Sequence, residues 1–149
     1  MAVTRGMRVL RAAGVPFDVH EYTFATKGAA YAAEVLEIEP QRMAKTLVVE
    51  LDGAFVFVLV PGDQELSLRE LARAAGGKHA ALAAERDAER VSGYQVGGIS
   101  PFGSKRELPV YAVASWLAFE RVALNAGGRG CIVELARDDV VRLLRPTPL

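Results

Sequence analysis

The sequence predicts an α+β domain with a mixed β-sheet. Segments that favour strands and segments that favour helices interleave along the chain, without the regular period of a βαβ fold. The 149 residues are the usual size of one compact domain with a single core. Because the chain shows no internal repeat, linker or low-complexity segment, we expect one domain covering residues 1–149.

A β-hairpin over residues 45–60 is the clearest local signal. Two β-prone runs are separated by Asp52 and Gly53, the pair that tight hairpin turns prefer. The second run is apolar at every position from 54 to 60. It is therefore expected to be buried on both faces, at a central place in a sheet that helices cover.

Capping residues predict where several helices begin and end. Thr4 precedes a helix that stops at Gly14, and Ser67 with Glu70 forms a capping box for a helix over 68–75. Other apolar patterns predict helices from Thr26 to Pro40 and over 84–90 and 138–144. Short strands are expected over 17–22, 110–113, 121–124 and 131–135.

Composition and missing motifs exclude several classes of protein. Eighteen basic residues balance eighteen acidic ones, which argues against binding nucleic acid through the overall charge. The longest strongly apolar stretch, 54–60, is too short for a membrane span, and a signal peptide is not evident, so we expect a cytoplasmic protein with no membrane partner. With Cys131 alone and no phosphate-loop, zinc-helix or dinucleotide motif, no metal and no cofactor is expected.

Three places could carry chemistry, and each has a plain structural alternative. Lys45 opens an apolar strand, where its ammonium either reaches a cavity or is simply solvated. The glycine-rich segment 93–103 either presents backbone N–H groups as an oxyanion hole or makes a tight crossover. Arg129, in the glycine turn 125–130, either binds phosphate or carboxylate or lies in an ordinary hairpin loop. His20 and His79 are expected to have structural or surface roles.

The segment GYQVGGISPFG at 93–103, with AKTLVVE at 44–50 and AGGRGCIVEL at 126–135, resembles the YbaK/ProX family of aminoacyl-tRNA deacylases, also called the prolyl-tRNA synthetase associated domain. The resemblance covers nearly the whole chain. It implies a mixed, strongly curved and partly barrel-like sheet flanked by helices. It also implies a free-standing editing enzyme that breaks the ester of mischarged tRNA, with the tRNA acceptor end and prolyl-tRNA synthetase as partners.

The resemblance also implies which residues form the site. Lys45 and Gly98 match the catalytic positions, the lysine being the most important side chain of the pocket and the glycine loop binding through its main chain. Tyr22 and Thr46 match other pocket positions, and the binding loop is matched by Val96, Gly97, Ile99, Ser100 and Pro101. From the second glycine turn, Asn125 and Arg129 are further candidate substrate-binding residues. Relatives similar to bacterial Cys-tRNA deacylases carry serine and aspartate where this chain has Asn125 and Ile132. Cys-tRNA(Pro) and Ala-tRNA(Pro) therefore both stay open as substrates.

Two other functions stay open beside the deacylase. A domain of this fold could hold tRNA or a nucleotide without catalysis, and Lys45 could instead form a Schiff base with a small carbonyl compound. A deacylase would take its nucleophile from water, a ribose hydroxyl or the substrate's thiol, because Cys131 is expected in an apolar strand as an inert thiol. We call the segments 93–103 and 125–130 the glycine loops. The cations expected to gather near them are Lys78, Lys105, Arg106, Arg121 and Arg129.

Overall fold

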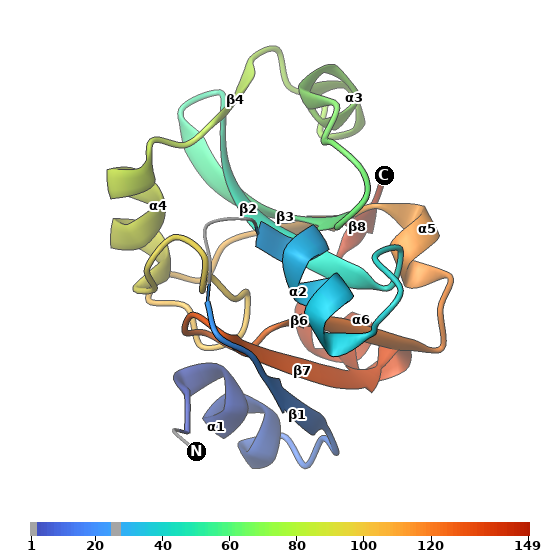
Figure 1. The fold of residues 1–149 in the computed structure, drawn as a ribbon. Helices are drawn as coiled ribbons and strands as arrows, with labels where there is room; N and C mark the ends of the chain where they lie inside the picture. Colours follow the sequence, from blue (N-terminus) through green and yellow to red (C-terminus); the bar gives the residue numbers. More distant parts are fainter. Residues whose placement is uncertain (1–2, 25–27) are drawn as a thin grey trace.

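Eight strands and six helices, within residues 3–24 and 28–149, make up the architecture of the computed structural model (Figure 1). The helices are α1 (Arg5–Ala12), α2 (Gly28–Leu36), α3 (Leu68–Ala74), α4 (Glu85–Ser92), α5 (Ala114–Leu117) and α6 (Arg137–Leu144). The strands are β1 (Asp18–Glu21), β2 (Met43–Leu51), β3 (Ala54–Pro61), β4 (Ala80–Leu82), β5 (Val110–Ala112), β6 (Arg121–Asn125), β7 (Cys131–Ala136) and β8 (Thr147–Pro148).

All described strands belong to one mixed sheet, as the sequence predicts. Its order is β1-β7-β6-β2-β3-β5-β8, with β4 paired to β2 away from this path. The pairs β2–β6, β3–β5 and β5–β8 are parallel, and the others are antiparallel. Strands β1 and β8 end the order without pairing to each other. The sheet is therefore open, and the expectation of a partly barrel-like sheet is corrected on this point.

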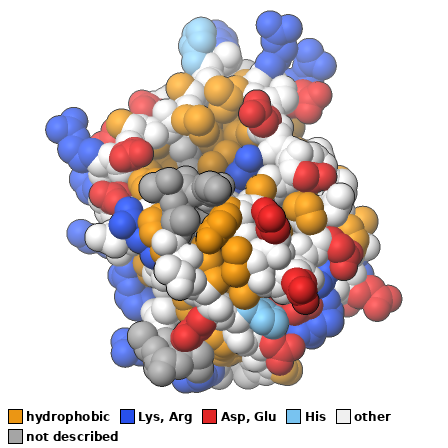
Figure 2. All heavy atoms as spheres, viewed as in Figure 1, with side chains coloured by type: hydrophobic (Ala, Val, Ile, Leu, Met, Phe, Trp, Pro, Cys, Tyr) orange, Lys and Arg blue, Asp and Glu red, His pale blue; other side chains and the backbone are white. Residues whose placement is uncertain are grey.

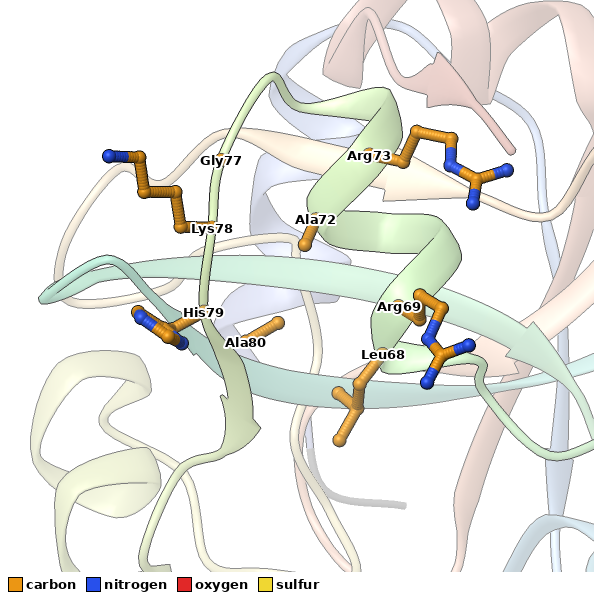
Figure 3. Close-up of a pocket in the computed structure, with 8 residues that line it drawn as sticks. All are labelled: Leu68, Arg69, Ala72, Arg73, Gly77, Lys78, His79 and Ala80. Carbon is orange, nitrogen blue, oxygen red and sulfur yellow. The ribbon is translucent and has the colours of Figure 1, made fainter.

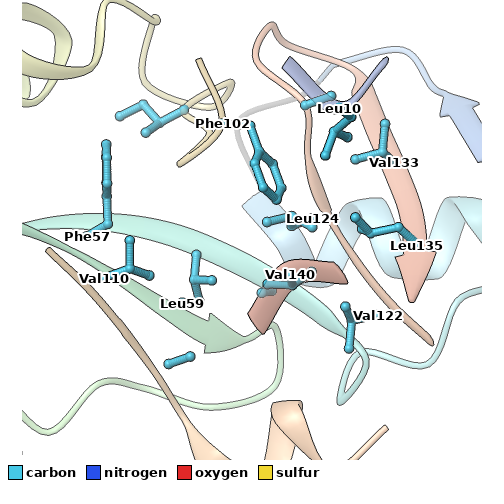
Figure 4. Packing of buried hydrophobic residues seen from close by; sticks show 14 of the residues in the cluster. Leu10, Phe57, Leu59, Phe102, Val110, Val122, Leu124, Val133, Leu135 and Val140 are labelled. Atoms are coloured by element: carbon cyan, nitrogen blue, oxygen red, sulfur yellow. The ribbon is translucent and has the colours of Figure 1, made fainter. Parts of the chain in front are cut away.

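The predicted hairpin is confirmed as β2 and β3. Their register runs to Leu51 opposite Ala54, so Asp52 and Gly53 alone make the turn, both with positive φ (49° and 84°). As predicted, β3 is buried on both faces. Val58 packs with Leu71 of α3 on one face. The other face joins the main core, where Figure 4 shows Phe57 and Leu59 among side chains from α1, β5, β6, β7 and α6.

The predicted helix caps are confirmed. The Thr4 Oγ1 atom accepts a hydrogen bond from the Met7 N–H at 3.1 Å, and the Ser67 Oγ atom accepts one from the Glu70 N–H at 3.2 Å. These side chains satisfy N–H groups that a helix start leaves without partners. The predicted helix start at Thr26 lies outside the described residues, and the described part of α2 ends before Pro40.

Three short elements were not predicted from the sequence. They are β4, with three residues, α5, with four, and β8, with two. Elements this short carry too few residues for an apolar period to show. Their positions depend on pairing instead, since β4 lies antiparallel to Val49–Leu51 of β2. Of the helices that the structure describes, none combines the length and the apolar character that crossing a bilayer would need.

Candidate functional site

Lys45 lies on β2 with its side chain on the face that α2 and α3 cover. Met43 and Val49 have the same parity on the strand and pack under α2 and α3 respectively. Lys45 lines a cavity of about 290 Å³ together with Leu47, Glu65, Leu66, Leu68 and Leu82. Its ammonium forms no ion pair or hydrogen bond within the part of the chain that the structure describes. The face seen in Figure 2 is largely hydrophobic between α3 and α2, with a basic side chain among the apolar ones.

Asn125 is the neighbour of Lys45 across the sheet. Strands β2 and β6 run parallel and pair Ala44 with Leu124, so Lys45 and Asn125 follow side by side where the two strands separate. Ligands bind preferentially where parallel strands diverge at their carboxyl ends. The Asn125 Oδ1 atom accepts a hydrogen bond from the Gly127 N–H at 2.6 Å, and its Nδ2 atom donates to the Gly97 carbonyl at 3.4 Å. Asn125 therefore ties the two glycine loops together beside Lys45.

The glycine loops make direct backbone contact. The Gly128 N–H donates to the Gly98 carbonyl at 2.8 Å, and Arg129 Nε donates to the Val96 carbonyl at 2.9 Å. A Cβ atom at Gly98 would lie 2.5 Å from the Gly128 carbonyl carbon, which leaves no room for a side chain. The Gly98 N–H donates to the Gln95 carbonyl at 2.8 Å. In this structure Gly98 therefore serves the close crossing of the two loops, and its catalytic role stays a prediction.

The next three loop residues, Ile99, Ser100 and Pro101, are buried. The Ser100 Oγ atom accepts a hydrogen bond from the Phe102 N–H at 3.1 Å, and Ser100 is fully buried. This hydroxyl therefore supports the turn. The N–H groups of Ile99 and Ser100 form no hydrogen bond with the described residues, which leaves two donors of the kind that an oxyanion site uses.

Tyr22 and Thr46 lie on different faces of the sheet. Tyr22 follows β1 on the α2 side, where its ring meets Tyr31 edge to face with centroids 6.3 Å apart. Burial, and then the neighbouring Tyr31, raise the pKa of the Tyr22 hydroxyl. Thr46 pairs with Leu59 and faces the main core, so its side chain points away from the face that carries Lys45. Its Oγ1 atom is buried and has no hydrogen-bond partner in the described part of the chain.

Phe24 belongs to the site but was not predicted. The Arg129 guanidinium carbon lies 4.6 Å from the centroid of the Phe24 ring, which is a cation–π contact. The same ring covers Gly97, where a Cβ atom would meet it at 2.6 Å. An aromatic residue two positions after Tyr22 was the available signal in the sequence. Glu65 and Leu82, which line the Lys45 cavity, carried none, because Glu65 lies in a loop and Leu82 is placed by the pairing of β4 with β2.

The predicted gathering of five cations near the glycine loops is wrong for two of them. Arg121 is ion-paired with Asp18 at 2.9 Å, near the outer strands β1 and β7, and Lys78 lies between α3 and β4. Lys105 and Arg106 donate backbone hydrogen bonds near the start of the 93–103 segment. Of the five, Arg129 contacts both glycine loops. Arg121 and Lys78 were misplaced because sequence distance does not report the sheet order.

His20 has the structural role that the sequence predicts. Its Nε2 atom lies 3.1 Å from Glu134 Oε1, and Arg42 Nη1 lies 2.6 Å from Glu134 Oε2. Burial alone would raise the pKa of Glu134, but the hydrogen bonds from Arg42 and His20 lower it below its usual value. Among the described residues, no three His, Cys, Asp or Glu side chains gather as a metal site would require.

Cys131 is buried on β7, as predicted. Burial, and then the nearby Glu21 carboxylate, raise the pKa of its thiol, which disfavours the reactive thiolate. Together with the engaged hydroxyl of Ser100, this leaves both side-chain nucleophiles near the glycine loops poorly suited to attack an ester.

Comparison with known proteins decides the family. The model of the aminoacyl-tRNA editing domain matches residues 23–143. This chain belongs to the aminoacyl-tRNA editing domain family. The resemblance stated from the three sequence motifs is thereby confirmed, and the matched range includes Lys45 and both glycine loops.

The relatives of this chain include two named as deacylases. The chain is 35% identical over 143 residues to the "Putative Cys-tRNA(Pro)/Cys-tRNA(Cys) deacylase EbsC" of Enterococcus faecalis, covering 94% of this chain and 87% of the relative. It is 34% identical over 110 residues to the "Multifunctional Ser/Thr-tRNA deacylase ProXp-y" of Escherichia coli, covering 69% of this chain and 65% of the relative. A match to proline–tRNA ligase of Moorella thermoacetica is 37% identical but spans only 16% of that enzyme.

The fold of this chain is shared with a solved structure. A crystal structure of "a putative trans-editing enzyme for prolyl tRNA synthetase" superposes with a TM-score of 0.86 over 99% of this chain and 97% of that one. The sequence identity is 22%, so this likeness supports the fold.

Proposed function

We propose that this chain is an aminoacyl-tRNA deacylase, which cleaves the ester between a wrongly attached amino acid and the terminal ribose of tRNA. Family membership and the deacylase names of two relatives support this function. The observation that carries it is the position of Lys45: an unpaired ammonium lies on a largely apolar cavity, beside the residue that joins the two glycine loops.

Lys45 stabilises the charge that develops during ester cleavage. Attack on the ester carbon turns the carbonyl oxygen into an oxyanion, and a fixed ammonium lowers the energy of that state more than the energy of the neutral ester. Four leucines line the cavity with it, and a low local dielectric strengthens this attraction. The N–H groups of Ile99 and Ser100 are further donors for the substrate.

The nucleophile comes from outside the protein. Cys131 is held as the thiol by burial, and the Ser100 hydroxyl is buried and already accepts a hydrogen bond. Water, a ribose hydroxyl of the tRNA and, for cysteine, the substrate's own thiol are the candidates. The protein contributes position and charge stabilisation to each of them.

For the substrate, we propose a small amino acid on tRNA(Pro), handled at its acceptor end in the cytoplasm. The relatives' names mention cysteine, serine and threonine, and the matches to proline–tRNA ligases point to that tRNA and to prolyl-tRNA synthetase as a partner. Asn125 is neutral and sits beside Lys45, which suits an uncharged side chain on the amino acid.

A panel of mischarged tRNA(Pro) tests the proposal. Cysteinyl, alanyl, seryl and threonyl forms are incubated with the protein, and the remaining ester is measured against incubation with Lys45→Ala. At least one form should lose its amino acid with the wild-type chain and keep it with the variant. If the tRNAs bind with every ester intact, the chain is a binding module of the same fold and the deacylase proposal fails.

A further inference from the structure

A cavity near the Lys45 face lies between α3 and β4. It measures about 500 Å³ and is lined by Leu68, Arg69, Ala72, Arg73, Gly77, Lys78, His79 and Ala80 (Figure 3). Four of these eight residues are basic, in a chain whose charges balance overall. We call this cavity the α3–β4 groove.

The cations of the groove have no carboxylate partners. Arg69, Arg73 and Lys78 form no ion pair with any residue that the structure describes, whereas Arg42 and Arg121 are held by carboxylates. Asp52 is the carboxylate that contacts this segment, and it accepts hydrogen bonds from the backbone N–H groups of Lys78 and His79. The groove therefore carries an excess of positive charge, since its lining includes three permanent cations and no carboxylate, although Glu70 lies nearby on α3.

The cations stand on the two walls of the groove. Figure 3 shows Arg69 and Arg73 extending from α3 on the side away from β4, and Lys78 extending outward from the opposite wall, so the cations lie on the two outer rims of the groove. Leu68, Ala72 and Ala80 are the small or apolar residues between them. Cations that converge on one point would suit a single anion. Cations on two walls suit a chain of phosphates that crosses between them.

The α3–β4 groove borders the Lys45 cavity. Leu68 lines both, and Leu82 at the end of β4 lines the Lys45 cavity. A chain lying in the groove can therefore extend over the same face of the molecule to Lys45. Leu82 is 59% exposed, so it is accessible at the border between the groove and the Lys45 cavity.

We propose that the α3–β4 groove binds the phosphate backbone of the tRNA, with Arg69 and Arg73 on one wall and Lys78 on the other, while the aminoacylated end occupies the Lys45 cavity. This inference rests on the proposed function. It adds the direction in which the tRNA leaves the site, across α3 rather than across the glycine loops.

The test compares two pairs of arginines that are alike on the surface. Arg69→Gln/Arg73→Gln removes two exposed cations from α3, and Arg8→Gln/Arg11→Gln removes two from α1 at the other end of the molecule (Figure 1). Binding of uncharged tRNA(Pro) is followed by fluorescence anisotropy between low and moderate salt. The α3 variant should bind roughly 10-fold more weakly, as expected for two lost surface charge contacts, while the α1 variant binds as the wild type does.

The salt dependence and a small substrate complete the test. For the α3 variant the slope of log affinity against log salt should fall in magnitude by about 0.7–0.9 for each lost phosphate contact. Lys78→Gln should act in the same direction by about half as much. Cleavage of an aminoacyl ester of adenosine, which has no phosphate chain, should be unchanged in all groove variants.

Two results overturn the inference. One is α3 and Lys78 variants that bind tRNA as the wild type does, and the other is an equal loss in the α1 variant, which would indicate unspecific attraction. A wild-type chain that cleaves no mischarged tRNA but loses binding through the groove variants would contradict the deacylase function and leave the groove assignment standing.

Discussion

Lys45 and Asn125 stand next to each other where the parallel strands β2 and β6 separate, directly after the last paired residues, Ala44 and Leu124. Asn125 is also the residue whose side chain contacts both glycine loops. The cation and the loops are therefore held in one arrangement by a single amide side chain, and both can be tested by substitution.

Replacing Asn125 should distinguish the effects of its two hydrogen bonds. Asn125→Asp keeps an acceptor for the Gly127 N–H but loses the donor to the Gly97 carbonyl. We expect deacylation to slow by at least about 10-fold, because the variant loses one hydrogen bond and also places a carboxylate beside the Lys45 ammonium. Asn125→Ala should lower both the deacylation rate and the melting temperature. Equal activity of Asn125→Asp and the wild type would show that the contact with Gly97 is dispensable.

Lys45→Ala should slow deacylation by at least ~100-fold, which is typical of losing one fixed electrostatic contact. Lys45→Arg should fail too, because a planar guanidinium does not replace a compact ammonium in this cavity. Arg86→Ala, at an exposed cation on α4, is the control and should keep full activity. Single-turnover rates on an authentic mischarged tRNA measure the effect. Near-normal turnover by Lys45→Ala would remove the residue from the mechanism.

Gly98→Ala should lower stability and activity together. The added Cβ atom would lie 2.5 Å from the Gly128 carbonyl carbon, so the loops must move apart. Overpacking of this kind costs about 1–3 kcal/mol, or roughly 2–10 °C in melting temperature for a chain of this size. Ser100→Ala should be milder in activity, since its hydroxyl supports only the turn.

The assay temperature separates packing from chemistry at Gly98. If Gly98→Ala stays slow far below its melting point, the loop also contributes to the chemical step. Recovery of full activity there would restrict Gly98 to the crossing of the loops. An inactive Ser100→Ala beside a healthy Gly98→Ala would instead indicate a serine hydroxyl in the reaction.

Cys131 should resist alkylation at neutral pH. Burial raises the pKa of its thiol, so the thiolate fraction is smaller than that of a free cysteine at the same pH. Treatment of the folded protein with iodoacetamide should leave deacylation intact, and mass spectrometry should find the thiol unmodified. Cys131→Ala should also stay active. Rapid modification with a parallel loss of activity would contradict this assignment.

Glu134→Gln should destabilise the protein at neutral pH more than in acid. The pKa of Glu134 is lowered in the folded state, so its ion pairs with Arg42 and His20 stabilise the fold above the usual glutamate range. This contribution is lost as the pH falls through the lowered pKa. Urea unfolding across that range should show the two proteins converging in acid. Glu107→Gln, an exposed loop position, should give no such convergence.

Local signals in the sequence predicted the parts of the fold that depend on neighbouring residues. The Asp52-Gly53 turn and the Ser67 cap act within a few residues, so the pattern alone defined them. The face of the sheet on which the Thr46 side chain lies, and the position of Lys78 in the fold, depend on pairing across the sheet. Phe24 was missed for the same reason, because its contact with Arg129 crosses more than a hundred positions of sequence.

Strand β2, which carries Lys45, pairs along its length with three different strands, β3, β4 and β6. Amide hydrogens in such a strand exchange with solvent only when a large part of the molecule opens. The glycine loops have fewer bonds and should exchange sooner. On warming, the enzyme should therefore lose substrate binding at the glycine loops while Lys45 is still correctly oriented. Inactivation should then be reversible at temperatures below global unfolding.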